Sequence, residues 1–189
     1  MRSASPFLIC MITTLSSMDL PAGAEALPWL VALWAGVWLL RPIATVIHEL
    51  GHTLPALALT EEEVELRIGE SFTKPLASFG RLGFAWSFRS SFTGFTGYER
   101  ERLSKMALSL VILGGPIASG LAFALGVWGT LSTTNPIWWR ISTAAFLCAN
   151  GIVFLRSAIP VTLRPTKQFP DGPPSDGLDL WRTLRGAND

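Results

Sequence analysis

Hydrophobic residues along the chain gather in four runs that are separated by polar segments. The first run is short, at about residues 7–15, and the others cover about 27–59, 107–131 and 137–159. Apolar stretches of about 20 residues with few charges are typical of transmembrane helices. We therefore predict membrane helices over about 27–58, 105–131 and 137–159. Residues 1–26 form a separate N-terminal segment, either a further membrane segment or a signal-like one.

The polar segment at about residues 60–100 has a different periodicity. Apolar and polar residues alternate over 64–68 and again over 82–86, and this period of two is typical of half-buried strands. Residues 94–97 begin and end with glycine, and we expect a loop there. The predicted fold is therefore mainly α and multi-pass, with a small β-hairpin or sheet between the first and second core helices.

The composition supports a membrane environment. The chain is 49% hydrophobic and only 15% charged, whereas about a quarter of the residues in a soluble domain are charged. The formal net charge is +1 and no basic stripe is present, so we expect a lipid bilayer and not a nucleic acid as partner. The sequence does not indicate an oligomeric state.

The distribution of lysine and arginine predicts the orientation. Residues 60–103 carry six of these cations and the segment after residue 159 carries four, whereas residues 132–136 carry none. The positive-inside rule therefore places the middle segment and the C-terminus in the cytoplasm. A short polar tail is expected at 181–189.

The motif HExxH occupies residues 48–52, late in the first long run, and contains both histidines of the chain. On a helix, His48 and His52 lie on one face about one turn apart. Two imidazoles so placed can bind one zinc ion, and Glu49 can act as the base for a zinc-activated water. The alternative is a structural pair of histidines hydrogen-bonded to backbone, with Glu49 bonded to one of them.

A catalytic zinc site usually has three protein ligands and one open position. The chain has no third histidine, so the third ligand must be a carboxylate or a cysteine. Asp171 and Asp176 each precede a glycine, and Asp179 follows closely. Glycine lets the backbone turn sharply and aim a carboxylate, but an Asp-Gly pair also marks ordinary turns. The residues alone do not choose between Asp171 and Asp176.

The HELGH motif, the sequence Gly114-Gly115-Pro116 in the next helix and the late Ser175-Asp176-Gly177 together resemble the site-2 protease family of intramembrane zinc metalloproteases. The resemblance covers about residues 27–180. It implies a three-helix catalytic core, one zinc ion near the cytoplasmic side, and cleavage of membrane-embedded proteins. It also implies a β-region that presents the substrate as an added strand, and it assigns the third zinc ligand to Asp176, with Asp171 as the second choice.

The sequence departs from the family pattern at the expected substrate-binding asparagine. Where the family often has Asn-x-x-Pro, this chain has Ser157 before Pro160, so the substrate-binding role is carried over to Ser157. Asn150 lies in the same helix off the motif position, and we expect it to make a helix–helix hydrogen bond. Arg41, about two turns before His48, is interpreted as paired within the bundle or snorkelling, with binding of a substrate carboxylate or carbonyl as the alternative.

Two functional hypotheses follow. The first is a zinc-dependent intramembrane endopeptidase that hydrolyses peptide bonds of membrane-embedded proteins, with Glu49 as its catalytic base. The second is an inactive scaffold of the same fold that binds transmembrane helices. An intact Glu49 favours the first hypothesis, because a purely structural zinc site needs no base.

Overall fold

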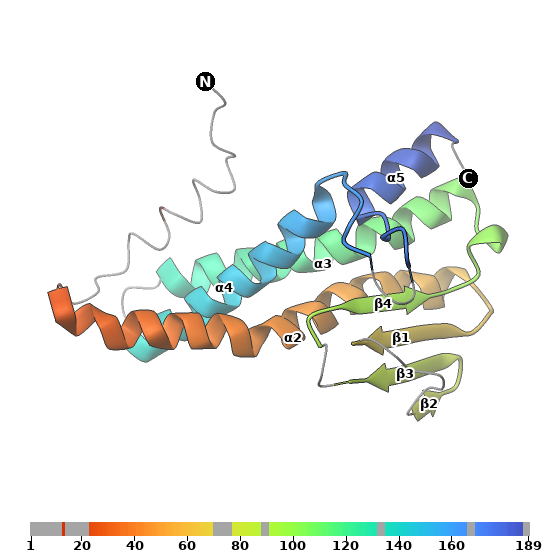
Figure 1. Cartoon of the computed structure of the whole chain (residues 1–189). Coiled ribbons are helices and arrows are strands. Elements are labelled where there is room, and N and C mark those ends of the chain that lie inside the picture. The colour runs from red at the N-terminus through yellow and green to blue at the C-terminus, as the bar shows by residue number, and fades with distance from the viewer. Residues whose placement is uncertain are drawn as a thin grey trace, which may run out of the picture.

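The computed structural model describes residues 13, 23–69, 77–87, 91–131, 135–165 and 169–186. Its core consists of three long helices, α2 (Leu27–Leu59), α3 (Lys105–Leu131) and α4 (Ile137–Ala158), which pack against one another (Figure 1). Each is long and apolar enough to cross a membrane. The predicted mainly helical fold with a small sheet is confirmed. The predicted N-terminal segment lies largely outside the described residues; its end forms a 3₁₀ turn, η1 (Gly23–Ala26).

Helix α2 has an inverted distribution of polarity. It runs unbroken through Pro42 and Pro55. Its large apolar side chains are exposed, for example Trp34 at 72% and Leu39 at 63%. The buried side chains of its second half are mostly polar: Thr45, His48, Glu49, His52 and Thr53. A helix that exposes apolar residues and buries polar ones suits surroundings of lipid around a polar interior.

Helices α2 and α3 cross at two glycines. A Cβ atom on Gly114 would overlap the carbonyl oxygen of Gly51, and a Cβ on Gly51 would overlap the carbonyl of Gly114. The two backbones therefore touch, as small residues permit in membrane helix pairs. Gly120 lies elsewhere on α3, and a Cβ there would lie 3.5 Å from Phe154, which is an ordinary contact.

The middle segment forms a four-stranded sheet with the order β2-β3-β1-β4. The strands are β1 (Val64–Ile68), β2 (Ala77–Phe79), β3 (Leu82–Trp86) and β4 (Gly94–Gly97). The alternation predicted for β1 is confirmed, because every second side chain is buried. Strands β2 and β3 are antiparallel, as in the predicted hairpin, whereas β1 and β3 are parallel.

The prediction of a loop at residues 94–97 is wrong. This stretch is strand β4, antiparallel to β1 with Thr96 opposite Leu66. The sequence pattern points away from a strand because glycine at both ends lowers strand propensity. Pairing of the backbone with β1 outweighs that preference, and it brings β4 against helix α2.

A short helix near the C-terminus, α5 (Asp176–Arg185), was not predicted. Local signals for it are present in the sequence. Ser175 caps its first turn by accepting a hydrogen bond from the Leu178 N–H, and Gly186 ends the helix in the left-handed conformation at φ 73°. Helix α5 packs mainly against α3 (Figure 1), so the predicted polar tail begins inside this helix.

The contact between the two glycines can be tested with a matched pair of alanine substitutions. Gly114→Ala forces apart α2 and α3, and we expect it to lower the free energy of unfolding by about 1–3 kcal/mol, as overpacking typically does. Gly120→Ala is the control, because its new methyl group meets only Phe154, at an ordinary contact distance of 3.5 Å. Reversible unfolding of both variants in detergent measures the difference. Equal stability of the two variants would contradict the close packing.

Candidate metal centre

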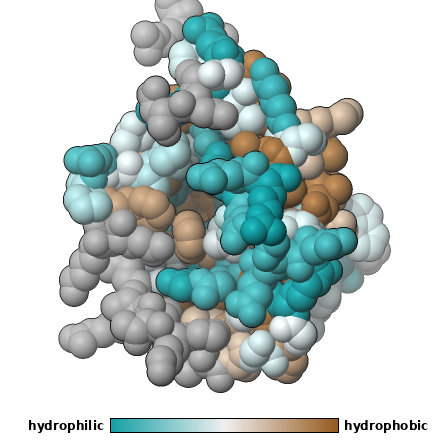
Figure 2. Space-filling view, turned by 90° about the vertical axis from the view of Figure 1, so that its right-hand side faces the viewer, coloured by the Kyte–Doolittle hydropathy of each residue, from teal (hydrophilic) through white to brown (hydrophobic). Residues whose placement is uncertain are grey.

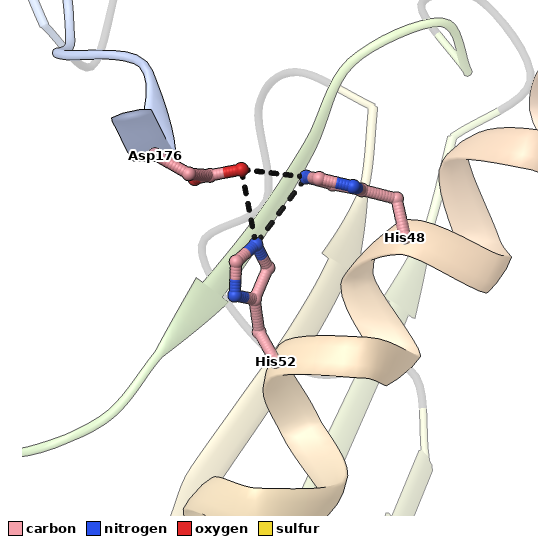
Figure 3. A group of neighbouring side chains, drawn as sticks. All are labelled: His48, His52 and Asp176. Carbon is pink, nitrogen blue, oxygen red and sulfur yellow. Dashed lines mark hydrogen bonds and ion pairs between the residues drawn. The ribbon is translucent and has the colours of Figure 1, made fainter. Parts of the chain in front are cut away.

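Two side chains of the first long helix and one of the last helix converge on one point. His48 and His52 project from the same face of α2, and Asp176 approaches from the first turn of α5 (Figure 3). The Oδ2 atom of Asp176 lies 3.0 Å from His48 Nε2 and 3.5 Å from His52 Nε2. The two Nε2 atoms are 3.3 Å apart. In the described part of the chain, these three residues are the one group whose ligand atoms could hold a metal ion. They are called the metal-binding group below.

The spacing of the three atoms fits a tetrahedral ion. Bonds of about 2.0–2.1 Å at tetrahedral angles place neighbouring ligand atoms about 3.3 Å apart, close to the three separations in this site. Asp176 Oδ2 is also buried without a hydrogen bond of acceptable geometry, although both imidazoles are nearby. A buried oxygen that lacks a partner is costly. A cation between the three atoms would satisfy it.

The second nitrogen of each imidazole has a partner on α3. His48 Nδ1 lies 3.0 Å from Ser119 Oγ, and His52 Nδ1 lies 2.8 Å from the carbonyl oxygen of Val111. If each Nδ1–H donates to its oxygen, the lone pair of each Nε2 points toward Asp176. Metal-binding histidines are oriented in this way by outer hydrogen bonds. Ser119 was not among the functional residues that the sequence predicts.

The second glycine of the Gly114-Gly115-Pro116 motif makes room for the imidazole ring of His52, a candidate metal ligand. A Cβ atom on Gly115 would overlap the imidazole ring of His52. Gly114 contacts the backbone of Gly51, and Gly115 contacts the ring of His52, the next residue along α2. The motif therefore sets both the spacing of the helices and the position of the imidazole.

Asp176 owes its position to its two neighbours in sequence. The Ser175 hydroxyl donates to the carbonyl of Ile159 at 2.6 Å, which ties the start of α5 to the end of α4. A Cβ on Gly177 would overlap the carbonyl of Ala158, so glycine is needed for close packing. We had expected this glycine to allow a sharp turn, but Gly177 lies inside a helix and is not among the glycines with positive φ.

The structure distinguishes between the two candidate aspartates. Asp171 precedes Gly172, which has φ 83° and donates its N–H to the carbonyl of Phe169, so this pair forms an ordinary turn. The Asp171 side chain is exposed and is not part of the metal-binding group. Asp179 does not belong to that group either, because both of its carboxylate oxygens accept hydrogen bonds from Arg100.

Glu49 lies beside the metal-binding group and is buried, with 7% of its surface exposed. Its Oε2 accepts a hydrogen bond of 2.8 Å from the Thr96 hydroxyl on β4. A Cβ on Gly94 would overlap the Glu49 side chain, so this strand passes directly over the carboxylate. The sheet therefore fixes the rotamer of Glu49. No pattern in the sequence predicts the contact between Thr96 and Glu49.

Charges around the site shape its protonation. Burial disfavours the ionised form of Asp176, but the adjacent imidazoles of His48 and His52 outweigh it and hold the pKa of this carboxyl well below its usual range. Burial raises the pKa of Tyr98, which lines the same cavity, to about 12. Tyr98 therefore remains a neutral hydroxyl at physiological pH.

The metal-binding group opens into a cavity of about 710 Å³ that is also lined by Glu49, β4 and the end of α4. Ser157 lines this cavity, but its hydroxyl donates to the carbonyl of Phe154 at 3.0 Å. Asn150 is fully buried, and among the described residues it does not make the helix–helix hydrogen bond that we expect from the sequence. It donates to Phe146 in its own helix at 2.9 Å.

Comparison with known proteins finds no counterpart: no family model, no curated protein and no solved structure matches the chain. The geometry of the site is therefore the basis for assigning a function.

Metal content distinguishes the two aspartates experimentally. We expect purified protein to carry about one equivalent of metal, and Asp176→Ala to lose most of it because one of three ligands is missing. Asp171→Ala, the matched Asp-Gly variant, should retain the metal. Elemental analysis by mass spectrometry gives the stoichiometry and identifies the ion. Loss of metal in Asp171→Ala with retention in Asp176→Ala would contradict the assignment.

The outer hydrogen bond to His48 predicts a smaller effect. Ser119→Ala leaves all three ligands in place but releases the His48 ring, so we expect metal affinity to fall about 10–100-fold. Ser109→Ala is the control on the same helix, since its hydroxyl donates only to the Lys105 carbonyl. Competition with a chelator of known affinity measures both variants. Equal affinities would show that Ser119 does not orient the ring.

Proposed function

We propose that the chain is a zinc-dependent intramembrane endopeptidase similar to the site-2 proteases. The observation that carries the proposal is the convergence of His48, His52 and Asp176 within 3.5 Å of one another, next to the buried carboxylate of Glu49. Three ligands leave a fourth position open, which is typical of catalytic zinc sites and not of structural ones.

Zinc is the proposed ion because of the donor set. Two histidines and one carboxylate are a known ligand set of zinc hydrolases, with separations that suit tetrahedral coordination. When bound, zinc would supply Lewis-acid chemistry, lowering the pKa of water and polarising a peptide carbonyl. His48 and His52 would hold the ion through Nε2, and Asp176 would hold it through Oδ2.

Glu49 is the proposed catalytic base. In this role its carboxylate accepts a proton from the attacking water and then delivers it to the leaving amine. Thr96 acts as a positioning residue, because its hydroxyl holds Oε2 at 2.8 Å. That hydrogen bond leaves Oε1 as the oxygen available for the proton, since Thr96 occupies the other. Strand β4 over the carboxylate also limits access of bulk water.

Strand β4 is the proposed platform for the substrate. It is an edge strand of the sheet, paired with β1 on one side only. Its residues line the cavity of the metal-binding group. An extended peptide could pair with the free edge of β4 through backbone hydrogen bonds. A protease needs such an extended substrate, because a helix protects its peptide bonds by internal hydrogen bonding.

The chain is proposed to be a multi-pass membrane protein with the metal-binding group toward the cytoplasm. Support comes from the three apolar helices and from the charges at the end that carries the sheet and α5. There Arg100 pairs with Asp179, and Arg102 pairs with Glu62 and Glu99. Hydrophilic surface extends across the middle of this end (Figure 2). The exposed Trp138 and Trp139 at the start of α4 suit the opposite interface.

The role of Glu49 can be tested by separating metal binding from cleavage. Glu49→Gln keeps the size of the side chain and removes the base, so we expect full zinc content and a loss of cleavage of at least about 10²–10⁴-fold. Glu63→Gln is the control, because Glu63 is exposed and lies outside the cavity. The readout is cleavage of membrane-protein substrates in proteoliposomes. If Glu49→Gln cleaved as fast as wild type, or wild type cleaved nothing, the inactive scaffold would be favoured.

A further inference from the structure

Four arginines line the cavity of the metal-binding group, and they fall into two pairs. Arg67 forms an ion pair with Glu65, and Arg100 forms one with Asp179. Arg41 and Arg156 have no carboxylate partner among the residues that the structure describes. The cavity therefore contains two cations whose charge is balanced within the protein and two whose charge is not.

Arg41 is an unusual residue for its position. It lies within the long apolar helix α2, and its Nε atom is buried without a hydrogen bond. Its guanidinium stands 5.6 Å from the ring centroid of Phe92, a cation–π arrangement that is weaker than an ion pair. The pairing within the bundle that we expected for Arg41 is not found in the described part of the chain. An unpaired charge at membrane depth is costly and marks a functional position.

Arg156 adds a second positive charge to the same place. It lies in the last turn of α4, is exposed, and lines the same cavity as Arg41. Two cations that line one cavity without a carboxylate partner among the described residues favour a negatively charged occupant. Guanidinium groups bind carboxylates through charge-assisted hydrogen bonds, often in pairs.

The location of the two arginines identifies the source of the anion. Arg41 precedes His48 by seven residues, so it lies on nearly the same face of α2 at about 10 Å along the axis. An extended peptide advances about 3.3 Å per residue. A peptide bound with its cleaved bond at the metal-binding group would therefore place about its third residue beside Arg41. Because the cavity connects both places, a single peptide can occupy both.

We propose that Arg41 and Arg156 form a specificity site that binds a carboxylate of the substrate, about three residues to one side of the cleaved bond. This proposal rests on the proposed protease function and names a preference within it. The carboxylate comes from an aspartate or glutamate side chain, or from a C-terminus that ends at this position. Substrates that carry a carboxylate there are preferred over neutral ones.

The test measures binding separately from cleavage. Glu49→Gln protein with zinc is titrated with fluorescent apolar peptides that differ at one position only, aspartate against asparagine, moved one residue at a time along the peptide. A second set compares a free C-terminus with an amidated one, to distinguish the two sources of carboxylate. We expect tighter binding of the carboxylate by about tenfold at one position, as a hydrogen-bonded charge provides.

Variants then assign the preference to the two arginines. Arg41→Gln and Arg156→Gln should each remove most of the aspartate preference, and Arg41→Lys should retain part of it. Arg164→Gln is the control, because Arg164 is exposed and outside the cavity. The ratio of aspartate to asparagine binding is taken within each variant, so a general loss of folded protein cancels. Arg41→Glu should abolish the aspartate preference, because the new carboxylate would offset the charge of Arg156.

Two outcomes would overturn the site. These are an equal affinity for aspartate and asparagine at every position, and a preference that survives both glutamine variants. Cleavage of the neutral peptides by wild-type protein, measured in parallel, reports on the protease function separately. Cleavage without a carboxylate preference rejects only the specificity site.

Discussion

The structure depends on one convergence: a carboxylate oxygen of α5 placed within reach of two imidazole nitrogens on α2. Asp176 Oδ2 lies 3.0 Å from His48 Nε2 and is buried without a hydrogen bond of acceptable geometry. Such an arrangement is unfavourable unless a cation completes it, because a buried unpaired oxygen loses its hydration. The end of α4, the turn that follows it and the N-terminal cap of α5 all serve to deliver this oxygen. The metal-binding group thus brings α5, the last helix, against the second half of α2.

Small residues make that convergence possible. Gly114 lets α3 touch the backbone of α2, Gly115 leaves space for the His52 ring, and Gly94 lets a strand pass over Glu49. At each position a single methyl group would displace either a backbone or a functional side chain. Close packing of this kind is the main source of helix association in lipid, where burial of apolar surface gives little driving force. The same contacts therefore serve both stability and the site.

The polar groups around the site differ in whether the protein supplies each of them with a hydrogen-bond or ionic partner. His48 pairs with the Ser119 hydroxyl, His52 with the Val111 carbonyl, and Glu49 with the Thr96 hydroxyl. Arg41 has no such partner among the described residues; it contacts an aromatic ring and lines the same cavity as Arg156. Positive charge without an internal partner, in a cavity shared with a metal-binding group, gives the proposed protease a basis for choosing its substrates.

The sequence by itself determined the three long helices and the histidine pair of the HExxH motif, because apolar length and the i, i+4 spacing are local properties. Strand β1 followed from its alternation in the same way. Only the tertiary structure decided between Asp171 and Asp176, since both precede glycine and the choice depends on how α5 packs on α4. Strand β4 and the lack of an ionic partner for Arg41 among the described residues were also invisible in the sequence. Pairing of a glycine-rich strand and the presence or absence of a counterion are set by residues distant along the chain.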